Sequence, residues 1–518
     1  MKLLTVAAMR ELERRAMDEL GLSGAVLMEN AGRGVADLIS SRYGAAFPGP
    51  LLVLAGKGNN GGDGFVLARH LRNRGWQVTT LVLAEEDAVR GDAAVNLAIL
   101  KKSGAPLRFA SDRATLNLEL AVLPPQGLVV DALFGTGLNS AVSGFQAAAI
   151  HWLNGCGAPV VAVDIPSGVD AGTGRLLGPA VQADLTVTFA YPKVGHVLHP
   201  GAGLLGELTL VDIGIPAAFS AACVKDALVL VDAAAAGELL PPRPIAGHKG
   251  TFGHLLVVAG SCGKVGAAAL AAAGGLRSGA GLVTVATPAA AHPALAAQLT
   301  EAMSEPLPEA DGVLAASALA RIETLLTGKA AVALGPGLGL AEPTTNLVRR
   351  LVEALPLPLV LDADGLGALA GELAPLGKRR AGNTILTPHP GEMARLCGLS
   401  VAEIEADRIG VARDFAARQR VVLVLKGART VIAAPDGRIF INGSGNPGLA
   451  AGGMGDVLTG LIGGLLAQGL TTLDAAVLGV YLHGAAADRL RDIMGDAGLI
   501  AGDLARELPL ARRALALK

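Results

Sequence analysis

With 518 residues, the chain is long enough for two or three domains, and we expect two. Lysine and arginine number 43 against 45 aspartate and glutamate residues, and the resulting net charge of -2 gives no general attraction to nucleic acid or to acidic membranes. The four cysteines lie far apart and form no C-x-x-C pair, which argues against a disulfide framework and a zinc site and favours the cytoplasm.

The first segment, residues 1–17, carries charges too early for a secretory signal, and its spacing predicts an amphipathic helix. The longest apolar runs, 265–276 and 457–467, are shorter than the roughly 20 residues that a membrane-spanning helix needs. We expect the chain to be cytoplasmic, to bind small molecules, and to have neither a nucleic acid nor a membrane as partner. We also expect a homo-oligomer.

Short aliphatic runs alternate with helical segments through the first half of the chain. The predicted strands are 51–56, 78–84, 127–135, 159–168, 184–190 and 207–214. Most of the stretches between them, such as 65–75 and 91–104, have helical spacing, so successive parallel strands with right-handed crossovers are the simplest topology. We predict a Rossmann-like doubly wound α/β sheet in a domain spanning residues 1–223.

A glycine-rich loop, LVLAGKGNNGGDG at residues 52–64, follows the first of these strands. Its G-x-G-x-x-G spacing is typical of dinucleotide-binding turns, with a helix expected to start at Gly64 to Phe65. A dehydrogenase fits this spacing, but the pattern alone is weak evidence in a glycine-rich chain. Asn59, Asn60 and Asp63 place oxygens where a pyrophosphate contacts backbone NH groups, and such oxygens suit a cation or a hydroxylated ring.

Two further strands of this half end in polar residues, Asp131 in one case and Asp164 with Ser167 in the other. The ends of neighbouring parallel strands meet at one crevice, so Asn60, Asp131 and Ser167 are candidate oxygen ligands of one metal ion. The same residue types also cap helices and turns, and this structural alternative stays open for each of them.

Beyond a proline-rich segment at 241–244, the alternation of strands and helices starts again. The predicted strands of this half are 254–260, 281–287, 330–337, 358–364, 383–391, 421–427 and 430–435. We place the domain boundary near residue 224 and predict a second α/β domain over residues 224–518.

The segment NPGLAAGGMGD at 446–456 opens a helix behind a series of glycines. Exposed NH groups there can stabilise a transferring phosphate while Asp456 takes a proton from an acceptor hydroxyl, although Asp456 can also be a plain helix cap. No G-x-x-x-x-G-K-[ST] motif is present, which favours a ribokinase-like kinase over a P-loop enzyme. Lys426 follows another strand and is either a point charge for a nucleotide phosphate or a solvated lysine.

The motifs GKGNNGGDG, DALFGTGL, DIPSG and PKVGH resemble, in this order, the NAD(P)H-hydrate epimerases of the YjeF N-terminal family, over most of residues 1–220. The resemblance implies that the hydrates NADHX and NADPHX bind here, that Asp164 is catalytic, and that K⁺ is held by Asn60, Asp131 and Ser167. The candidate substrate-binding residues that it implies are Asn59, Asn60, Gly61, Gly62, Asp63, Gly135, Thr136, Gly137, Leu138 and Asp164.

The motifs GPGLG, HPGE, KGART and GGMGD resemble the ADP- or ATP-dependent NAD(P)H-hydrate dehydratases, a branch of the ribokinase-like fold, over roughly residues 226–510. This resemblance implies that ADP or ATP, with Mg²⁺, phosphorylates the substrate hydroxyl, which then leaves as phosphate. The residues implied to bind the hydrate are Ala267, Gly337, Gly339, His389 and the catalytic Asp456. The residues implied to bind the nucleotide are Lys426, Gly427, Ala428, Arg429, Thr430 and Gly455.

The two resemblances together predict a bifunctional repair enzyme. The first domain is expected to interconvert the R and S hydrates, and the second to dehydrate the S form with ADP, giving AMP and phosphate. One alternative is a ribokinase-like kinase for a vitamin precursor, which would leave phosphate on a stable alcohol. Another is a non-catalytic first domain, against which the polar residues Asn59, Asn60 and Asp63 argue.

Overall fold

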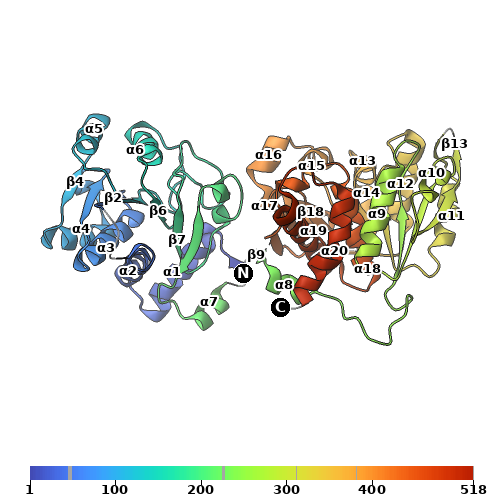
Figure 1. Cartoon of the computed structure of the whole chain (residues 1–518), viewed down its shortest axis with the longest axis horizontal. Coiled ribbons are helices and arrows are strands. Elements are labelled where there is room, and N and C mark those ends of the chain that lie inside the picture. Colours follow the sequence, from blue (N-terminus) through green and yellow to red (C-terminus); the bar gives the residue numbers. More distant parts are fainter. Residues whose placement is uncertain (45–48, 225–227, 311, 381, 517–518) are drawn as a thin grey trace. The chain divides into compact units, whose positions relative to one another are not determined.

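A mainly parallel sheet forms the centre of each of two units, Lys2–Ala227 and Leu228–Lys518 (Figure 1). The computed structural model describes residues 1–44, 49–224, 228–310, 312–380 and 382–516. The predicted fold class, two α/β domains with a Rossmann-like sheet first and a ribokinase-like domain second, is confirmed. The limits given for the domains, 1–223 and 224–518, stay a prediction, because residues 225–227 are outside the described residues.

The N-terminal unit contains one parallel sheet in the strand order β4-β3-β2-β5-β6-β7-β8. All of its predicted strands form, and the short strand β4 was not predicted. The strands of this sheet are β2 (Leu51–Ala55), β3 (Val78–Val82), β4 (Leu107–Phe109), β5 (Leu128–Ala132), β6 (Val160–Val163), β7 (Leu185–Phe189) and β8 (Glu207–Val211), and the short strand β1 (Lys2–Leu3) is not part of it. Every residue of β2 and β5 is buried, as expected for parallel strands covered on both faces.

Helices cover both faces of this sheet. The helices are α1 (Val6–Leu20), α2 (Gly24–Tyr43), α3 (Asn59–Asn73), α4 (Gly91–Lys102), α5 (Arg113–Ala121), α6 (Gly144–Gly155) and α7 (Ala217–Cys223), with 3₁₀ turns at Glu86–Ala88, Val194–His196 and Gly201–Gly203. Apolar side chains of α1 to α4 pack on one face, and those of α5 and α6 pack on the other (Figure 1). The predicted amphipathic N-terminal helix is thus confirmed as α1, which buries Met9, Leu12 and Ala16.

The main sheet of the C-terminal unit runs in the order β9-β20-β19-β18-β17-β16-β15-β10-β11-β12. Its strands are β9 (Leu228–Val231), β10 (His254–Val258), β11 (Leu282–Pro288), β12 (Met303–Leu307), β15 (Ala331–Leu334), β16 (Leu359–Leu361), β17 (Thr384–Leu386), β18 (Val422–Leu425), β19 (Val431–Ala433) and β20 (Ile439–Asn442). The short strands β13 (Glu309–Ala310) and β14 (Val313–Leu314) form a separate antiparallel pair. Each strand predicted for this half forms. The pairs β18–β19 and β19–β20 are antiparallel, and the central strands are parallel.

The helices of this unit surround the sheet (Figure 1). They are α8 (Ala233–Gly237), α9 (Val265–Arg277), α10 (His292–Ala296), α11 (Ala318–Leu325), α12 (Glu342–Ala354), α13 (Asp364–Ala368), α14 (Ala374–Gly377), α15 (Pro390–Cys397), α16 (Val401–Ala406), α17 (Arg408–Gln419), α18 (Met454–Ala467), α19 (Thr472–Met494) and α20 (Ala501–Ala516), with a 3₁₀ turn at Pro447–Leu449. None of the described helices combines the length and apolarity that crossing a membrane requires.

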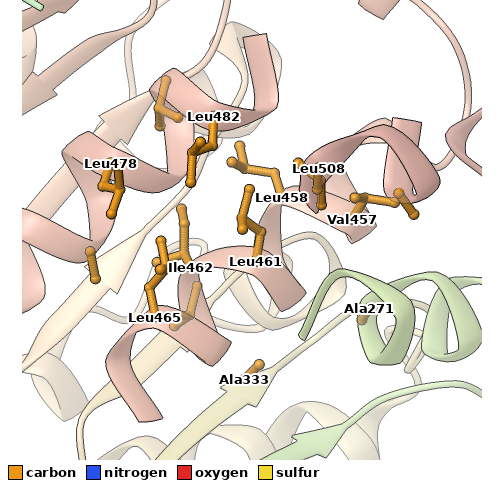
Figure 2. Packing of buried hydrophobic residues seen from close by; sticks show 14 of the residues in the cluster. Ala271, Ala333, Val457, Leu458, Leu461, Ile462, Leu465, Leu478, Leu482 and Leu508 are labelled. Carbon is orange, nitrogen blue, oxygen red and sulfur yellow. The ribbon is translucent and has the colours of Figure 1, made fainter. Parts of the chain in front are cut away.

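Helix α18 lies in the core of the C-terminal unit and packs against α9, α19 and α20 (Figure 2). It touches α9 through glycines, since a Cβ on Gly460 would lie 1.8 Å from the carbonyl oxygen of Ala271, and one on Gly274 would lie 2.2 Å from that of Val457. The backbones of the two helices are therefore in direct contact, which fixes the position of the start of α18.

Candidate functional site

The first candidate site lies where the order of the N-terminal sheet reverses. Strands β3 and β5 flank β2 on opposite sides, so the loops after β2 and β5 diverge and leave a crevice at the carboxyl ends of the strands. We call the residues gathered there the N-terminal site, and they are Asn60, Asp131, Gly135, Asp164, Ser167 and Lys193.

The glycine loop after β2 is shorter than predicted. Helix α3 begins at Asn59 and not at Gly64 to Phe65, so the expected helix start is wrong. The glycines lower the helix propensity of this turn, but the close packing requires them: a Cβ on Gly61 would lie 1.9 Å from the carbonyl oxygen of Gly56. A Cβ on Gly62 would lie 2.6 Å from the side chain of Met28. Neither position has room for a side chain, so both must be glycine.

Asn60 is buried in the first turn of α3, with 8% of its surface exposed. Among the residues that the structure describes, neither Oδ1 nor Nδ2 of Asn60 has a hydrogen-bond partner. A Cβ on Gly135 would lie 3.1 Å from both Asn60 Oδ1 and Asp164 Oδ2, so the loop after β5 passes between these side chains. An unpaired buried amide costs free energy, which a bound ligand or ion can recover.

Asp131 and Ser167 bind each other at the ends of β5 and β6. Asp131 Oδ1 accepts from Ser167 Oγ at 2.6 Å, and its Oδ2 accepts from the Ser167 backbone NH at 2.8 Å. Burial raises the pKa of Asp131 to about 6, against the lowering effect of these hydrogen bonds. Ser167 Oγ also accepts from the NH of Phe134 at 2.8 Å, so this pair fixes the loop that carries Gly135. Both residues therefore have a structural role in holding this loop. Their oxygens still have lone pairs that a cation could use.

Asp164 has a left-handed backbone, with φ of 65°. Its Oδ1 accepts from Lys193 Nζ at 2.9 Å and from Thr188 Oγ1 at 3.0 Å, and its Oδ2 accepts from the Thr136 NH at 3.3 Å. Burial alone would raise the pKa of Asp164, but the neighbouring positive charge, chiefly that of Lys193, and the hydrogen bonds from Lys193 and Thr188 together outweigh it, and the pKa lies below its usual value. Asp164 is thus an ionised carboxylate with one oxygen directed at the loop after β5.

Lys193 and His196 complete this site, and neither was predicted as a site residue. Lys193 is 2% exposed, and its ammonium also donates to Thr188 Oγ1 at 2.8 Å and to the Phe189 carbonyl at 3.2 Å. His196 accepts from the Lys193 NH through Nδ1 and donates through Nε2 to the Asp164 carbonyl at 2.8 Å. Burial, and then the charge of Lys193, lower the pKa of His196 to about 4, so the ring is neutral. The PKVGH motif was the sequence signal for both residues.

Two more carboxyl groups lie close enough to Asp164 to interact with its charge. The pKa of Asp63 is raised well above its usual value, first by burial and then by the negative charges of Asp164 and Glu13. Burial likewise raises the pKa of Glu13, a residue of α1 that the sequence did not indicate. Helix α1 borders the loop after β5, since Arg10 donates to the Thr136 carbonyl at 3.4 Å. The site thus combines an ionised carboxylate with acids that favour protonation.

The remaining residues predicted for this site differ in their surroundings. Leu138 donates its NH to the Gly135 carbonyl at 3.2 Å and closes the turn that contains Thr136 and Gly137. Asn59 is exposed at the first position of α3. Contact of these residues with a substrate stays a prediction.

The second candidate site lies at the carboxyl ends of β15 to β18 and at the start of α18. We call its residues the C-terminal site, and they are Gly337, Asp362, Glu392, Lys426, Gly455 and Asp456. Lys426 Nζ lies 2.8 Å from Asp362 Oδ1 and 3.7 Å from Glu392 Oε2, so it is not a solvated lysine. Burial would lower the pKa of Lys426, but the carboxylates of Asp362 and Glu392 raise it.

Asp362 connects this pair to α18, because its Oδ2 accepts from Thr459 Oγ1 at 2.6 Å. Asp456 lies one turn earlier in α18, behind Gly453, whose φ of 85° favours glycine. Burial, followed by the charge of Asp362, raises the pKa of Asp456 to about 7. A Cβ on Gly455 would lie 3.5 Å from Lys426 Nζ. The structure thus brings Lys426, Gly455 and Asp456 together, and Asp362 is the connecting residue that the sequence did not indicate.

The KGART segment turns sharply after β18. Gly427 has φ of 147°, and a Cβ there would lie 2.5 Å from Nη1 of Arg408, a buried residue of α17. Arg408 donates to the carbonyls of Leu425 and Lys426 at 3.2 and 3.3 Å. Arg429 is used within the protein, since it donates to the Gly443 carbonyl at 2.7 Å. Gly427 and Ala428 are exposed, so their backbone is accessible to a nucleotide. Nucleotide binding by this segment, including Thr430, stays a prediction.

The glycine turn after β15 meets the start of α9. A Cβ on Gly337 would lie 3.1 Å from Ala267 Cβ, and the Gly339 NH donates to Asp364 Oδ2 at 2.8 Å. Ala267, Gly337 and Gly339 are therefore close together, as the dehydratase resemblance implies. His389 instead caps α15: its Nδ1 accepts from the Gly391 NH at 3.0 Å, and its side chain is 51% exposed. Its contact with a substrate stays a prediction.

Neither site contains a cluster typical of a tightly held transition metal. Among the described residues, no group of three or more His, Cys, Asp or Glu side chains could hold a metal ion. All four cysteines belong to the described residues and are free thiols.

Comparison with known proteins gives matches along nearly the whole chain. A family model described as NAD(P)H-hydrate dehydratase matches residues 255–510, and a model described as YjeF-related protein N-terminus matches residues 24–195. The chain is 46% identical over 517 residues to the bifunctional NAD(P)H-hydrate repair enzyme Nnr of Moorella thermoacetica, covering 99% of this chain and 97% of that protein. The Escherichia coli K12 protein of the same name is 37% identical, with 96% and 91% covered.

Among solved structures, the chain is similar to the ADP/ATP-dependent NAD(P)H-hydrate dehydratase of Bacillus subtilis, co-crystallized with ATP/Mg²⁺. The match has a TM-score of 0.48 and 35% sequence identity, and it covers 56% of this chain and 99% of that one.

Proposed function

Because the chain belongs to the family of bifunctional NAD(P)H-hydrate repair enzymes, we propose that it restores NADH and NADPH from their hydrates. The N-terminal site interconverts the R and S hydrates. The C-terminal site dehydrates the S hydrate with ADP, giving AMP and phosphate. The observation that carries this proposal is Asp456, a carboxylate beside a lysine at the start of a helix, with a pKa near 7 that suits a base at neutral pH.

In the C-terminal site, Asp456 accepts the proton of the substrate hydroxyl while the hydroxyl oxygen attacks the terminal phosphorus of ADP. The bond from that phosphorus to AMP breaks. The new phosphate then leaves the ring carbon with the bonding electrons, and the neighbouring ring carbon loses a proton, so that the elements of water are removed. Lys426 and the free NH groups of α18 are suited to neutralise the charge on the phosphoryl group.

Mg²⁺ in nucleotide sites usually takes one or two protein carboxylates and completes its shell with phosphates and water. Glu392 fits this requirement, because it is 8% exposed beside Lys426, and the closest polar contact of its Oε1 within the described part of the chain is 3.6 Å, to His389. With Mg²⁺ bound, the metal would offset the negative charge of the transferring phosphate.

In the N-terminal site, epimerisation proceeds through a ring-opened or iminium species. Both routes need one ionised base and one protonated acid around the hydroxyl-bearing carbon. Asp164, which Lys193 keeps ionised, is the base. Asp63, whose raised pKa keeps it protonated, is the acid. Lys193 acts through Asp164 and is a positioning residue. The residues Asn59 to Asp63 and Gly135 to Leu138 bind the substrate.

Potassium fits this site, because the buried amide oxygen of Asn60 has no hydrogen-bond partner among the described residues. Asp131 and Ser167 retain lone pairs beside the loop that carries Gly135. Held by Asn60, Asp131 and Ser167, the ion would supply fixed positive charge next to the bound hydrate.

The cytoplasmic location and the homo-oligomeric state of the protein stay predictions.

The test uses purified R and S hydrates of NADH, with ADP and Mg²⁺, and follows the absorbance of the reduced nicotinamide ring. We expect recovery from both forms, with phosphate and AMP released in equal amounts. A phosphorylated alcohol without recovered NADH would instead establish a kinase for another substrate.

A further inference from the structure

A cavity of the C-terminal unit lies away from the residues of the C-terminal site, at the far end of α9. It has a volume of about 400 Å³ and is formed by the end of α9, the end of α20 and the segment before β10. Its lining residues are Arg243, Leu276, Arg277, Gly279, Pro509, Arg512, Arg513 and Ala516. We call it the arginine cavity. At about 1.5 Å per helical residue, Arg277 is about 15 Å along α9 from Ala267 of the C-terminal site.

The charge of the arginine cavity is unbalanced. Four guanidinium groups line it, and no carboxylate belongs to its lining in the described part of the chain. Arginines elsewhere are commonly paired with acids, as Arg321 is with Glu305 and Arg489 with Glu507. Since the whole chain has a slight excess of acidic residues, this local excess of positive charge is not a consequence of composition.

Two of the four arginines are held in place by the backbone. Arg243 donates to the Gly279 carbonyl at 2.9 Å and stacks 3.9 Å above the ring of Phe252. Arg512 donates to the carbonyls of Ser278 and Pro241 at 3.3 and 3.1 Å. Burial, and then the positive charge of Arg243, lower the pKa of Arg512. Like charges are thus fixed close together, which an anion would relieve.

The other two arginines are available to a ligand. Arg277 and Arg513 are exposed, and neither forms a hydrogen bond or ion pair with a residue that the structure describes. The planar guanidinium fork binds two oxygens of a phosphate at once. The carbon atoms of Leu276, Pro509 and Ala516 provide an apolar wall beside these charges. The volume lies within the usual range for small-molecule pockets.

We propose that the arginine cavity binds a nucleoside phosphate, with the phosphates on Arg277 and Arg513 and the base on the apolar wall. A nucleoside phosphate satisfies both the charge and the apolar surface, whereas inorganic phosphate satisfies the charge alone. The cavity adjoins the helix that carries Ala267 and that contacts α18 through Gly274 and Gly460. Binding there is independent of the proposed chemistry of the C-terminal site.

The test is a calorimetric titration of the full-length protein with ADP at low ionic strength. We compare the wild type with the variant Arg277→Gln/Arg513→Gln and with a matched control, Arg113→Gln/Arg350→Gln, which changes two other exposed arginines. The number of ADP molecules bound per chain should fall by one in the first variant only, or the affinity of one site should fall at least about tenfold. The rate of ADP-dependent dehydration should be the same in both variants as in the wild type, which verifies folding.

Equal stoichiometry and affinity in the wild type and the Arg277→Gln/Arg513→Gln variant would overturn the proposal. This readout is a difference between variants, so it does not depend on ADP binding at the C-terminal site. A parallel titration with pyrophosphate tests the role of the base: we expect binding to the cavity to be at least about tenfold weaker than that of ADP. Equal affinity would overturn the assignment to nucleoside phosphates.

Discussion

The N-terminal and C-terminal sites each contain a bound aspartate–lysine pair, but the pKa of the proposed base is lowered in one site and raised in the other. In each, a buried aspartate at the end of a parallel strand binds a lysine, Asp164 with Lys193 at 2.9 Å and Asp362 with Lys426 at 2.8 Å. In the N-terminal site the lysine binds the proposed base itself, and the pKa of Asp164 is lowered. In the C-terminal site the lysine binds a neighbour, and the pKa of Asp456 rises to about 7.

The difference teaches that the choice of the lysine's partner decides the protonation state of the carboxylate that we propose as the base of each site. Both aspartates are removed from water, which by itself raises a carboxyl pKa. Only Asp164 has a cation within hydrogen-bonding distance to reverse that effect. Asp456 interacts instead with the negative charge of Asp362, which adds to the effect of burial.

The largest effect is expected for Asp456→Asn. Removing the base should lower the kcat of dehydration by about 10²- to 10⁴-fold, because an amide cannot accept the hydroxyl proton. Epimerisation, measured as conversion of the R to the S hydrate above the spontaneous rate, should be unchanged and serves as the internal control. Dehydration at more than a tenth of the wild-type rate would exclude Asp456 as the base.

Lys193→Met should have the next largest effect, because it should raise the pKa of Asp164, which Lys193 now lowers. Loss of the cation leaves Asp164 buried without compensation, so its pKa should rise by about 1–3 units and the acid limb of epimerase kcat/KM should move to higher pH by that amount. Breaking a buried pair also costs about 3–5 kcal/mol of stability, measurable by denaturant unfolding.

Two controls separate these effects. Lys101→Met removes an exposed lysine that pairs with Glu86 and should change neither property. Adding Asp164→Asn to Lys193→Met should restore part of the stability without restoring activity. An unmoved acid limb in a folded Lys193→Met protein would show that Lys193 does not set the ionisation of Asp164.

Asp362→Asn should shift the pH dependence of dehydration by a smaller amount, and toward lower pH. Asp362 raises the pKa of Asp456, so its removal should lower that pKa and extend dehydration to lower pH, with the acid limb moving down from about 7. The overall rate should also fall, because Lys426 and Thr459 lose their partner. The relevant measurement is the ratio of rates at pH 6 and pH 8, and a ratio equal to or below that of the wild type would contradict the account.

The smallest effect is expected for Gly427→Ala. The new methyl would lie 2.5 Å from Arg408 Nη1 on a backbone with φ of 147°, so the KGART turn must shift. A cost of about 1–2 kcal/mol corresponds to a KM for ADP about 5- to 30-fold higher, with kcat nearly unchanged. Gly437→Ala is a matched control, since it has φ of 91° and no atom within 4 Å of the new Cβ. Equal KM values in the two variants would place the nucleotide away from this turn.

Much of the fold could be predicted because its strands are apolar runs bounded by glycine, proline or polar residues. The run at 51–56 became β2 and the run at 421–427 became β18 for this reason. The start of α3 was predicted too late, since its glycines reduce helix propensity but are needed where the helix touches Gly56. Strand β4 is three residues long at the edge of the sheet, too short for a clear pattern.

The sites could be predicted where neighbouring strand ends carry polar residues, as for Asn60 and Asp164. The partners that set their charge could not, because those contacts depend on three-dimensional packing. Lys193 follows Asp164 by 29 residues, and Asp362 is 64 residues from Lys426. Glu13 lies on an amphipathic helix, where a glutamate normally indicates the solvent-facing side.

The most direct test of the account compares the pH profiles of the two activities in one preparation of the wild-type protein. Dehydration of the S hydrate should lose kcat/KM below about pH 7, where Asp456 becomes protonated. Epimerisation of the R hydrate, after subtraction of the spontaneous rate, should remain constant from pH 8 through pH 7, because the pKa of Asp164 lies below its usual value, and should fall only as Asp131 is protonated near pH 6. Coincident acid limbs near pH 7 for both activities would contradict the assignment of opposite protonation behaviour to the two sites.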